Sequence, residues 1–365
     1  MSAFLLQWNL FGDSILTASP RIFIANRPSN VAATLVSRSV QARIVEPFRY
    51  LADHLPLQMQ IGMPQEAADL DSLEWIFFNK AIDQTSLEIA RAARAKGVRI
   101  SYDIDDHILN YPGYSGAKLD GNSRSVIHQF LELSDVVTVA NEALLQRYAS
   151  KCRNITLLPN GIYFESYETE ASGPGCSNDH SDRRPTVGFT NADLLKMENF
   201  RSGWLEATRI LRTRFPAVRF AYFGDFSPST LGLEGWEWLG SINLQKYRCT
   251  LFSRIFDIAL VPLGGHEDPE SFDFNSCKNP FKYIEFGAAG VPGIYSRVPI
   301  YEDVVKDQET GYLVPNESEA WIAATERLLK DGAFRQKIAR NAQLDVMNRF
   351  HIKRAAAVLR KIVLP

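Results

Sequence analysis

Residues 276–292 read SCKNPFKYIEFGAAGVP, the pattern of a short helix with a distinct beginning and end. The sequence predicts an N-cap at Asn279, a proline at the first helical position, and an end before Gly290. Lys282 and Glu285 are three residues apart, so they share one face near the helix N-terminus. That end favours a phosphate, and a carboxylate one turn further in can bind a ribose diol. The stretch predicts a site for a nucleoside diphosphate; a surface Lys–Glu pair is the alternative.

The composition indicates a globular protein of two domains. A chain of 365 residues exceeds one ordinary core, and 45% hydrophobic with 22% charged residues is typical of soluble proteins. The net charge of −2 argues against a nucleic-acid partner. The four scattered cysteines predict reduced thiols in a cytoplasmic protein. Met1–Phe11 is apolar but too short for a span and lacks a basic leader, so at most a peripheral contact at the inner face of a membrane is expected.

Short apolar runs alternate with helical patterns along the whole chain. Many of these runs are apolar on both faces, as strands buried in a parallel sheet must be. Alternating strands and helices therefore predict the α/β class. The predicted strands are Arg21–Asn26, Glu74–Asn79, Val98–Asp103, Asp135–Ala140, Ile155–Asn160, Thr186–Thr190, Val218–Gly224, Asp257–Leu263, Pro292–Ser296 and Gly311–Pro315.

One segment without periodicity divides the pattern into two doubly wound halves. It contains Ser-Gly-Pro-Gly-Cys-Ser-Asn-Asp-His-Ser-Asp, and we predict a linker over residues 166–184. The predicted domains are 1–165 and 185–350. A last helical pattern, within 351–365, follows after the second domain is complete.

Polar and small residues follow several of the predicted strands. In open α/β sheets ligands bind at the carboxyl ends of the strands, so these residues are candidates for a binding site. Each of them is also a common turn or cap residue, which is the alternative. They are Asn26, Asp103, Asn141, Asn160, Asn191, Asp225 and Gly264.

One such strand end carries three carboxylates and an imidazole, at Asp103, Asp105, Asp106 and His107. Charges this close together are costly unless they are solvated, paired or functional. One interpretation is a D-x-D site for a divalent ion on a diphosphate. A second places Asp103 or a neighbour at the acceptor as an orienting group or base. The third is a solvated loop in which Asp106 caps a turn.

Several common motifs do not occur in the sequence. It contains no G-x-G-x-x-G, no Walker A sequence, no G-x-S-x-G elbow and no zinc-ligand pair. Lys196 follows the first predicted strand of the second half and could reach a phosphate, although an exposed lysine is usually only a solvated charge.

Taken together, the ordered segments resemble glycosyltransferase family 4 and its relatives with the GT-B fold. The likeness covers nearly the whole chain and is strongest from Asp257 to Phe350. The segments that carry it, in the family's order and spacing, are SDVVTVAN at 134–141, LPNGI at 158–162, DIALVPL at 257–263, the stretch 278–292, YEDVV at 301–305 and TGYLV at 310–314. A branch of bacterial surface-polysaccharide transferases is similar at YDIDD and at SCKNPFK.

The resemblance implies two Rossmann-like domains that face each other across a cleft, with the last helix crossing back to the first. It implies a retaining, metal-independent transferase of the hexosyl or deoxyhexosyl type. This enzyme moves a sugar from a nucleotide-diphosphate donor, bound by the C-terminal domain, to a carbohydrate or glycoconjugate acceptor, bound by the N-terminal domain. Polysaccharide or glycoconjugate biosynthesis is the implied role. No cofactor and no metal are expected.

The resemblance also implies roles for particular residues. Glu285 matches the second glutamate of the E-x7-E motif and should hold the donor ribose, while Lys282 and Lys196 should approach the diphosphate. Asp103 stands where many members have a histidine near the reacting centre. The remaining expected contacts to the donor are Lys278, Asn279, Ser276, Asn191 and Gly264. Those expected on the acceptor side are Asp105, Asp106, His107, Asn26 and Asn160.

Two departures from the family pattern leave other functions open. Cys277 occupies the position of the first glutamate, so that role is vacant or shifts to Ser276 or Lys278. The arginine that accompanies the diphosphate lysine has no clear match near Asn191. The alternatives are a nucleotide-sugar epimerase on the same fold and a non-catalytic partner that binds nucleotide sugars in a glycan assembly complex.

Overall fold

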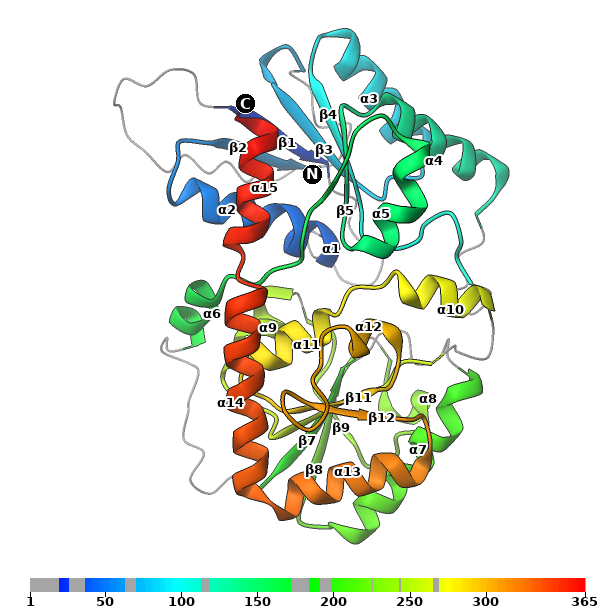
Figure 1. The fold of residues 1–365 in the computed structure, drawn as a ribbon, viewed down its shortest axis with the longest axis vertical. Coiled ribbons are helices and arrows are strands. Elements are labelled where there is room, and N and C mark those ends of the chain that lie inside the picture. Colours follow the sequence, from blue (N-terminus) through cyan, green and yellow to red (C-terminus); the bar gives the residue numbers. More distant parts are fainter. Residues whose placement is uncertain are drawn as a thin grey trace.

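The protein contains two parallel six-stranded sheets, each covered by helices, stacked along the long axis of the molecule (Figure 1). The computed structural model describes residues 20–25, 37–62, 70–112, 119–171, 184–190, 198–224, 226–242, 244–264 and 269–364. The strand orders are β2-β1-β3-β4-β5-β6 and β12-β11-β10-β7-β8-β9. This arrangement confirms the predicted α/β class and the two Rossmann-like domains of the GT-B fold.

The first sheet belongs to the N-terminal domain, and its strands are β1 (Arg21–Ala25), β2 (Gln58–Gly62), β3 (Trp75–Asn79), β4 (Arg99–Ile104), β5 (Val136–Val139) and β6 (Ile155–Leu157). The main helices are α1 (Arg38–Val40), α2 (Glu46–Ala52), α3 (Gln84–Ala95), α4 (Gly121–Leu133), α5 (Glu142–Tyr148) and α6 (Phe164–Ala171). A π-helical turn, η1 (Gln41–Val45), joins α1 to α2. Short 3-10 turns lie at Leu70–Ser72 and Ala149–Lys151.

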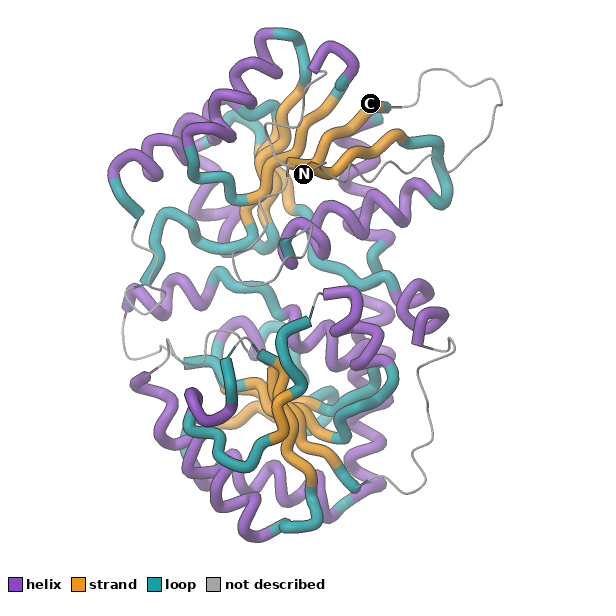
Figure 2. The backbone as a smooth tube through the Cα atoms, turned by 180° about the vertical axis from the view of Figure 1, so that it is seen from behind, coloured by secondary structure: helices purple, strands orange, loops and turns teal. Residues whose placement is uncertain are grey.

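The second sheet belongs to the C-terminal domain, and its strands are β7 (Thr186–Thr190), β8 (Arg219–Phe223), β9 (Glu237–Trp238), β10 (Ile258–Val261), β11 (Gly293–Ser296) and β12 (Tyr312–Val314). Its helices are α7 (Glu198–Arg214), α8 (Pro228–Leu231), α9 (Leu244–Phe252), α10 (Pro269–Ser276), α11 (Phe281–Ala288), α12 (Pro299–Glu302), α13 (Ser318–Lys330) and α14 (Gly332–Arg349). The last helix, α15 (Lys353–Val363), leaves this domain. Helices lie on both sides of each sheet when the chain is seen from behind (Figure 2).

The predicted strands are all present, and two further strands were not predicted. Among the described strands, β2 pairs only with β1, and buried residues alternate along it with exposed or partly exposed ones. A half-exposed edge strand has no continuous apolar run, so the pattern used for buried strands does not detect it. β9 is two residues long and exposed, at the far edge of the second sheet.

The last helix crosses back onto the N-terminal domain, where α15 lies beside α2 (Figure 1). Ala355, Leu359 and Val363 are buried there in one hydrophobic cluster with residues of β1. The chain between α14 and α15 passes close to Gly161, and this requires a glycine, because a Cβ at that position would lie 2.9 Å from the Cα of Ile352. The glycine of the LPNGI segment therefore lets the C-terminal chain pass at close range.

The connection between the domains begins with α6, which overlaps the start of the predicted linker. Phe164 and Tyr167 pack in the hydrophobic core of the C-terminal domain. Residues 172–183 lie outside the described part of the chain. Among the described residues, no helix has both the length and the apolar character that a membrane span requires.

Candidate functional site

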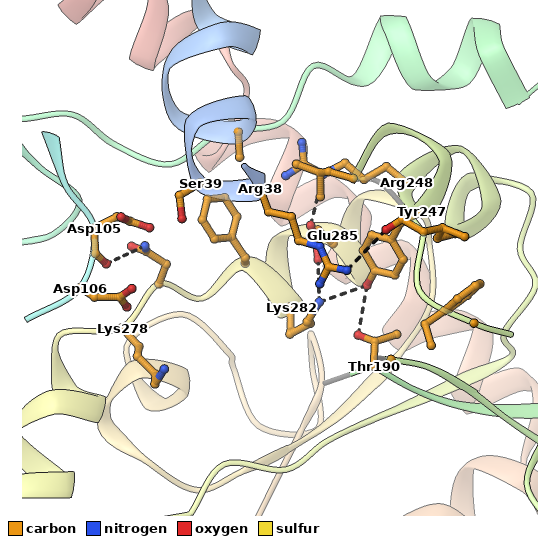
Figure 3. Close-up of a pocket in the computed structure, with 18 residues that line it drawn as sticks. Arg38, Ser39, Asp105, Asp106, Thr190, Tyr247, Arg248, Lys278, Lys282 and Glu285 are labelled. Carbon is orange, nitrogen blue, oxygen red and sulfur yellow. Dashed lines mark hydrogen bonds and ion pairs between the residues drawn. The ribbon is translucent and has the colours of Figure 1, made fainter. Parts of the chain in front are cut away.

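A cavity of about 270 Å³ lies between the two domains (Figure 3). Arg38, Ser39 and Ala42, from α1 and η1, line it on the N-terminal side together with Asp105 and Asp106, which follow β4. The C-terminal side is formed by the ends of β7 and β8 and by α9 and α11. Its polar lining residues are Thr190, Tyr247, Arg248, Lys278, Asn279, Lys282 and Glu285. Both walls thus include residues at the carboxyl ends of strands, where ligands bind in open α/β sheets.

The N-terminus of α11 differs from the prediction at Asn279. The helix begins at Phe281, and its cap position is Pro280, which makes no side-chain capping bond. The Asn279 side chain instead donates to the Asp105 carbonyl (2.9 Å) and accepts from Asn160 Nδ2 (2.7 Å). The predicted N-cap is therefore wrong, because this amide is used to bridge the two domains.

The Lys282 and Glu285 side chains meet as their spacing predicts. Lys282 Nζ lies 3.1 Å from Glu285 Oε2 and 3.3 Å from the Tyr247 hydroxyl, and the ammonium stands over the Tyr247 ring. Glu285 is only 3% exposed. Burial alone would raise the pKa of its carboxyl, but Lys282 and Arg248 outweigh burial and hold that pKa below its ordinary value. Glu285 is therefore an anion at neutral pH.

Arg248, on α9, is a residue of the site that sequence reasoning missed. It is fully buried, and its Nε donates to Glu285 Oε1 at 3.2 Å. Its Nη1 donates to both carboxylate oxygens of Glu46, on α2, at 2.8 and 2.6 Å. Tyr167 also donates to Glu46. One arginine thus joins the N-terminal domain to the glutamate of α11.

The sequence did contain a signal for Arg248. The buried residues of α9 are Leu244, Tyr247, Arg248 and Leu251. They have the spacing i, i+3, i+4 and i+7 of an apolar stripe, and one of them is charged. A charge on the buried face of an amphipathic helix requires a buried partner, so this position is a candidate for a functional or bridging ion pair.

Asp103 does not line the cavity, contrary to the prediction that it contacts substrate. It is 0% exposed, and Arg43 Nε and Nη2 bind its two oxygens at 2.7 and 2.6 Å. Thr138 and Asn79 donate to the same carboxylate. Because protein donors satisfy both oxygens, Asp103 is a structural anion beneath the site. The same pairing weakens the interpretation of this cluster as a metal site.

Asp105 and Asp106, in contrast, face the cavity (Figure 3). Lys80 Nζ lies 2.9 Å from Asp105 Oδ1 and 2.7 Å from Asp106 Oδ2. Burial works to raise the pKa of Asp106, but Lys80 and Lys278 hold it below its ordinary value. No group of three or more metal-ligating side chains occurs within the described ranges.

Several other predicted site residues lie outside the cavity wall. His107 lies against Tyr148 and 3.3 Å from Asp273 Oδ2. The Ser276 hydroxyl donates back to Phe272 within α10, and the Gly264 carbonyl accepts from Asn275. Asn160 accepts from Arg43 and donates to Asn279, so it contacts a residue that lines the cavity without lining it itself. Asn26, Asn191 and Lys196 lie outside the described residues.

Comparisons with known proteins agree with this geometry. Residues 280–345 match the family model "Glycosyl transferases group 1", and this segment begins just before α11. No curated protein matches the sequence.

Several solved structures share the fold over most of the chain. Sucrose-phosphate synthase from Thermosynechococcus elongatus is 17% identical, with a TM-score of 0.61 over 94% of this chain and 98% of that one. HepE from Anabaena, solved with UDP and glucose, is 14% identical, with a TM-score of 0.61 over 94% and 99%. A structure described as a putative UDP-N-acetylglucosamine 2-epimerase from Listeria monocytogenes is 12% identical, with a TM-score of 0.60 over 94% and 96%. The family model covers residues 280–345, and the solved structures show that the chain as a whole has the two-domain GT-B fold.

Proposed function

We propose that the protein transfers a sugar, with retention of anomeric configuration and without a metal ion, from a nucleotide-diphosphate sugar to a hydroxyl of a carbohydrate or glycoconjugate acceptor. The observation that carries the proposal is the interdomain cavity, whose C-terminal wall contains Lys282 and Glu285 of the matched segment. HepE, which has the same fold, was solved with UDP-glucose. A role in polysaccharide biosynthesis, in the cytoplasm or at the inner face of its membrane, is part of the proposal.

The two walls of the cavity suggest how the substrates are placed. Glu285 is an anion with free lone pairs and would accept hydrogen bonds from the donor ribose. Lys282, Lys278 and the N-terminus of α11 would lie near the diphosphate. Asp105 and Asp106, on the opposite wall, would accept hydrogen bonds from acceptor hydroxyls. The family pattern adds Lys196 as a second diphosphate lysine.

The chemistry follows from these positions. The bond from the anomeric carbon to the diphosphate breaks, and negative charge grows on the leaving group while the sugar becomes oxocarbenium-like. Lys282 and the helix N-terminus would stabilise that charge, which is usually the largest catalytic contribution. A leaving-group oxygen would take the proton of the attacking hydroxyl on the same face, which gives retention. Closure of the domains would exclude water and limit hydrolysis.

The first experiment is thermal unfolding with UDP, GDP, dTDP, ADP and CMP, with and without magnesium. A ligand that binds only the folded state raises the melting temperature by mass action. We expect one nucleoside diphosphate to stabilise the protein without magnesium. Failure of all five, well above ordinary affinities, would contradict the donor site. Stabilisation only with magnesium would contradict metal independence.

The catalytic role of Lys282 is tested by Lys282→Ala in a transfer assay with the nucleotide sugar that the panel selects. We expect kcat to fall by about 10²–10³, the usual effect of removing one group that stabilises transition-state charge. Tyr283→Phe is the matched control, because Tyr283 lies on the same helix but does not line the cavity, and its hydroxyl donates to Asp345 in a partly buried hydrogen bond. Unchanged kcat in folded Lys282→Ala would remove this lysine from the mechanism.

Two alternatives have specific support. The fold of the Listeria protein described as an epimerase matches over 94% of this chain. An epimerase would convert UDP-N-acetylglucosamine without an acceptor, which proton NMR would detect. A non-catalytic binding role is suggested by Cys277 in place of the first motif glutamate. Burial raises the pKa of its thiol to about 12, so it is neutral and cannot supply the missing anion. Donor binding without any turnover would favour this second alternative.

A further inference from the structure

We propose that Glu46 and Arg248 are positioning residues of the donor site. Glu46, from the N-terminal domain, holds the Arg248 guanidinium in an orientation in which Nε, but not Nη2, binds the Glu285 carboxylate. The remaining lone pairs of this carboxylate can then accept hydrogen bonds from a ribose. The inference rests on the proposed nucleotide-sugar site and adds a dependence of that site on the other domain.

The positions of the three side chains support this arrangement. Glu46 is 2% exposed and is not among the residues that line the cavity, whereas Arg248 and Glu285 are. Arg248 lies between the two carboxylates, with Nη1 toward Glu46 and Nε toward Glu285. The bonds to Glu46, at 2.8 and 2.6 Å, are shorter than the 3.2 Å bond to Glu285. The guanidinium is therefore held more tightly from the N-terminal domain than from its own.

The contact between Arg248 and Glu285 uses only half of the available guanidinium edge. Nε and Nη2 form the edge that usually binds both oxygens of a carboxylate. Arg43 uses both atoms of this edge to bind Asp103, at 2.7 and 2.6 Å. Arg248 uses only Nε, and its buried Nη2 has no hydrogen-bond partner in the described part of the chain. An unpaired buried donor is costly, and such exceptions are expected at functional sites.

The single hydrogen bond between Arg248 and Glu285 leaves room for a ligand on the carboxylate. A carboxylate has about four lone-pair sites, and Glu285 uses one for Arg248 and one for Lys282. The remaining sites are available to a diol. If Arg248 turned until Nη2 also reached Glu285, it would occupy one of them. Glu46 prevents that turn because both of its oxygens bind Nη1.

The wide turn η1 helps to place Glu46. This turn ends at Val45 and is followed directly by α2, which begins at Glu46. Single π-helical turns are often found at functional sites, where they change which residues face inward. Arg43 and Glu46 are both buried here, and Arg38 and Ser39 of the preceding turn line the cavity. The same segment thus forms the acceptor-side wall and anchors the donor-side arginine.

The test compares the affinities of UDP and 2′-deoxy-UDP by titration calorimetry, or the GDP pair if the nucleotide panel selects GDP. The wild type should prefer the ribonucleotide. We expect Glu46→Gln to weaken UDP binding by about tenfold or more and to reduce this preference, because the guanidinium is then free to close over Glu285. Arg248→Lys should also weaken UDP binding, because an ammonium cannot hold the carboxylate in the same way.

The decisive comparison is the double variant. If Glu46 acts through the guanidinium, Glu46→Gln should change UDP affinity far less in the Arg248→Lys background than in the wild type. Tyr283→Phe controls for loss of stability and should leave both affinities unchanged. If Arg248→Lys does not fold, the ribose preference of Glu46→Gln decides by itself.

The outcomes separate this inference from the proposed function. Wild-type protein that binds none of the nucleoside diphosphates would contradict both. Wild-type protein that binds UDP or GDP, together with a folded Glu46→Gln variant of unchanged affinity and unchanged ribose preference, would overturn only the positioning role. Additive effects of the two substitutions would also overturn it.

Discussion

At the scale of residues, the acidic cluster at the end of β4 divides into one carboxylate that is enclosed by protein donors and two that line the cavity. Asp103 is fully enclosed with Arg43, whereas Asp105 and Asp106 share Lys80 at the cavity wall. The sequence places all three within four positions, but their partners come from different parts of the fold. Their expected contributions to stability and activity therefore differ strongly.

The first prediction compares two substitutions within this cluster. Asp103→Ala leaves Arg43 as a buried, unpaired charge, which should lower the free energy of unfolding by about 3–5 kcal/mol. Asp106→Ala removes a partly exposed partner of Lys80 and should lower it by about 1 kcal/mol or less. Urea unfolding measures both values. A destabilisation by Asp106→Ala as large as that by Asp103→Ala would contradict this division.

The second prediction concerns pH and Glu285. Its pKa is lower in the folded protein than its ordinary value, so ionised Glu285 stabilises the fold above pH ~4.5, and this contribution is lost as the pH falls through the folded pKa. Urea unfolding between about pH 5 and pH 3 should therefore show a steeper loss of stability for the wild type than for Glu285→Gln. Identical slopes would mean that the ion pairs of Glu285 with Lys282 and Arg248 do not contribute to the free energy of unfolding.

At the scale of elements, the C-terminal helices join the two domains in different ways. α14 packs on α11 of the C-terminal domain, and α15 packs on α2 of the N-terminal domain. Leu359, on α15, is 0% exposed, whereas Leu344, on α14, is 59% exposed. These two leucines provide a matched pair for testing the role of α15.

The third prediction is that Leu359→Ala lowers the free energy of unfolding by about 2–5 kcal/mol, because it opens a cavity between α15 and the first sheet. Leu344→Ala, the control, should change it by no more than about 0.5 kcal/mol. Hydrogen exchange should show the loss of protection in α15, α2 and β1. An unaffected N-terminal domain would contradict the docking of α15.

At the scale of the whole molecule, α10 and the turn that follows it belong to the C-terminal domain but contact the N-terminal one. Arg147 Nε donates to Asp273 Oδ1 at 2.9 Å, and Asn110 donates to the other oxygen at 3.0 Å. Asn141 Nδ2 donates to the carbonyls of Cys277 and Lys278. These contacts form a polar seam between the two domains.

The fourth prediction is that Asp273→Asn loosens this seam, since it removes the charge that Arg147 binds. We expect a larger radius of gyration in small-angle X-ray scattering and a loss of about 1 kcal/mol in stability. Wild-type protein under the same conditions provides the reference. An unchanged radius of gyration would show that the remaining contacts, among them that of Asn141, hold the domains by themselves.

The sequence by itself determined what depends on near neighbours in the chain. Apolar runs such as β10 predicted buried parallel strands, and the three-residue spacing of Lys282 and Glu285 predicted their meeting on α11. Both patterns are local, because strand and helix periodicity fix which side chains share a face. The half-exposed β2 did not give such a pattern.

Only the tertiary structure decided which charges are buried and what each one binds. Glu46 and Arg248 are 202 positions apart, and Arg43 and Asp103 are 60 apart. A residue's type gives its charge, but the cost of burying that charge depends on partners brought by distant segments. For the same reason Asn279, a good helix cap by its local sequence, bonds across the domain interface instead.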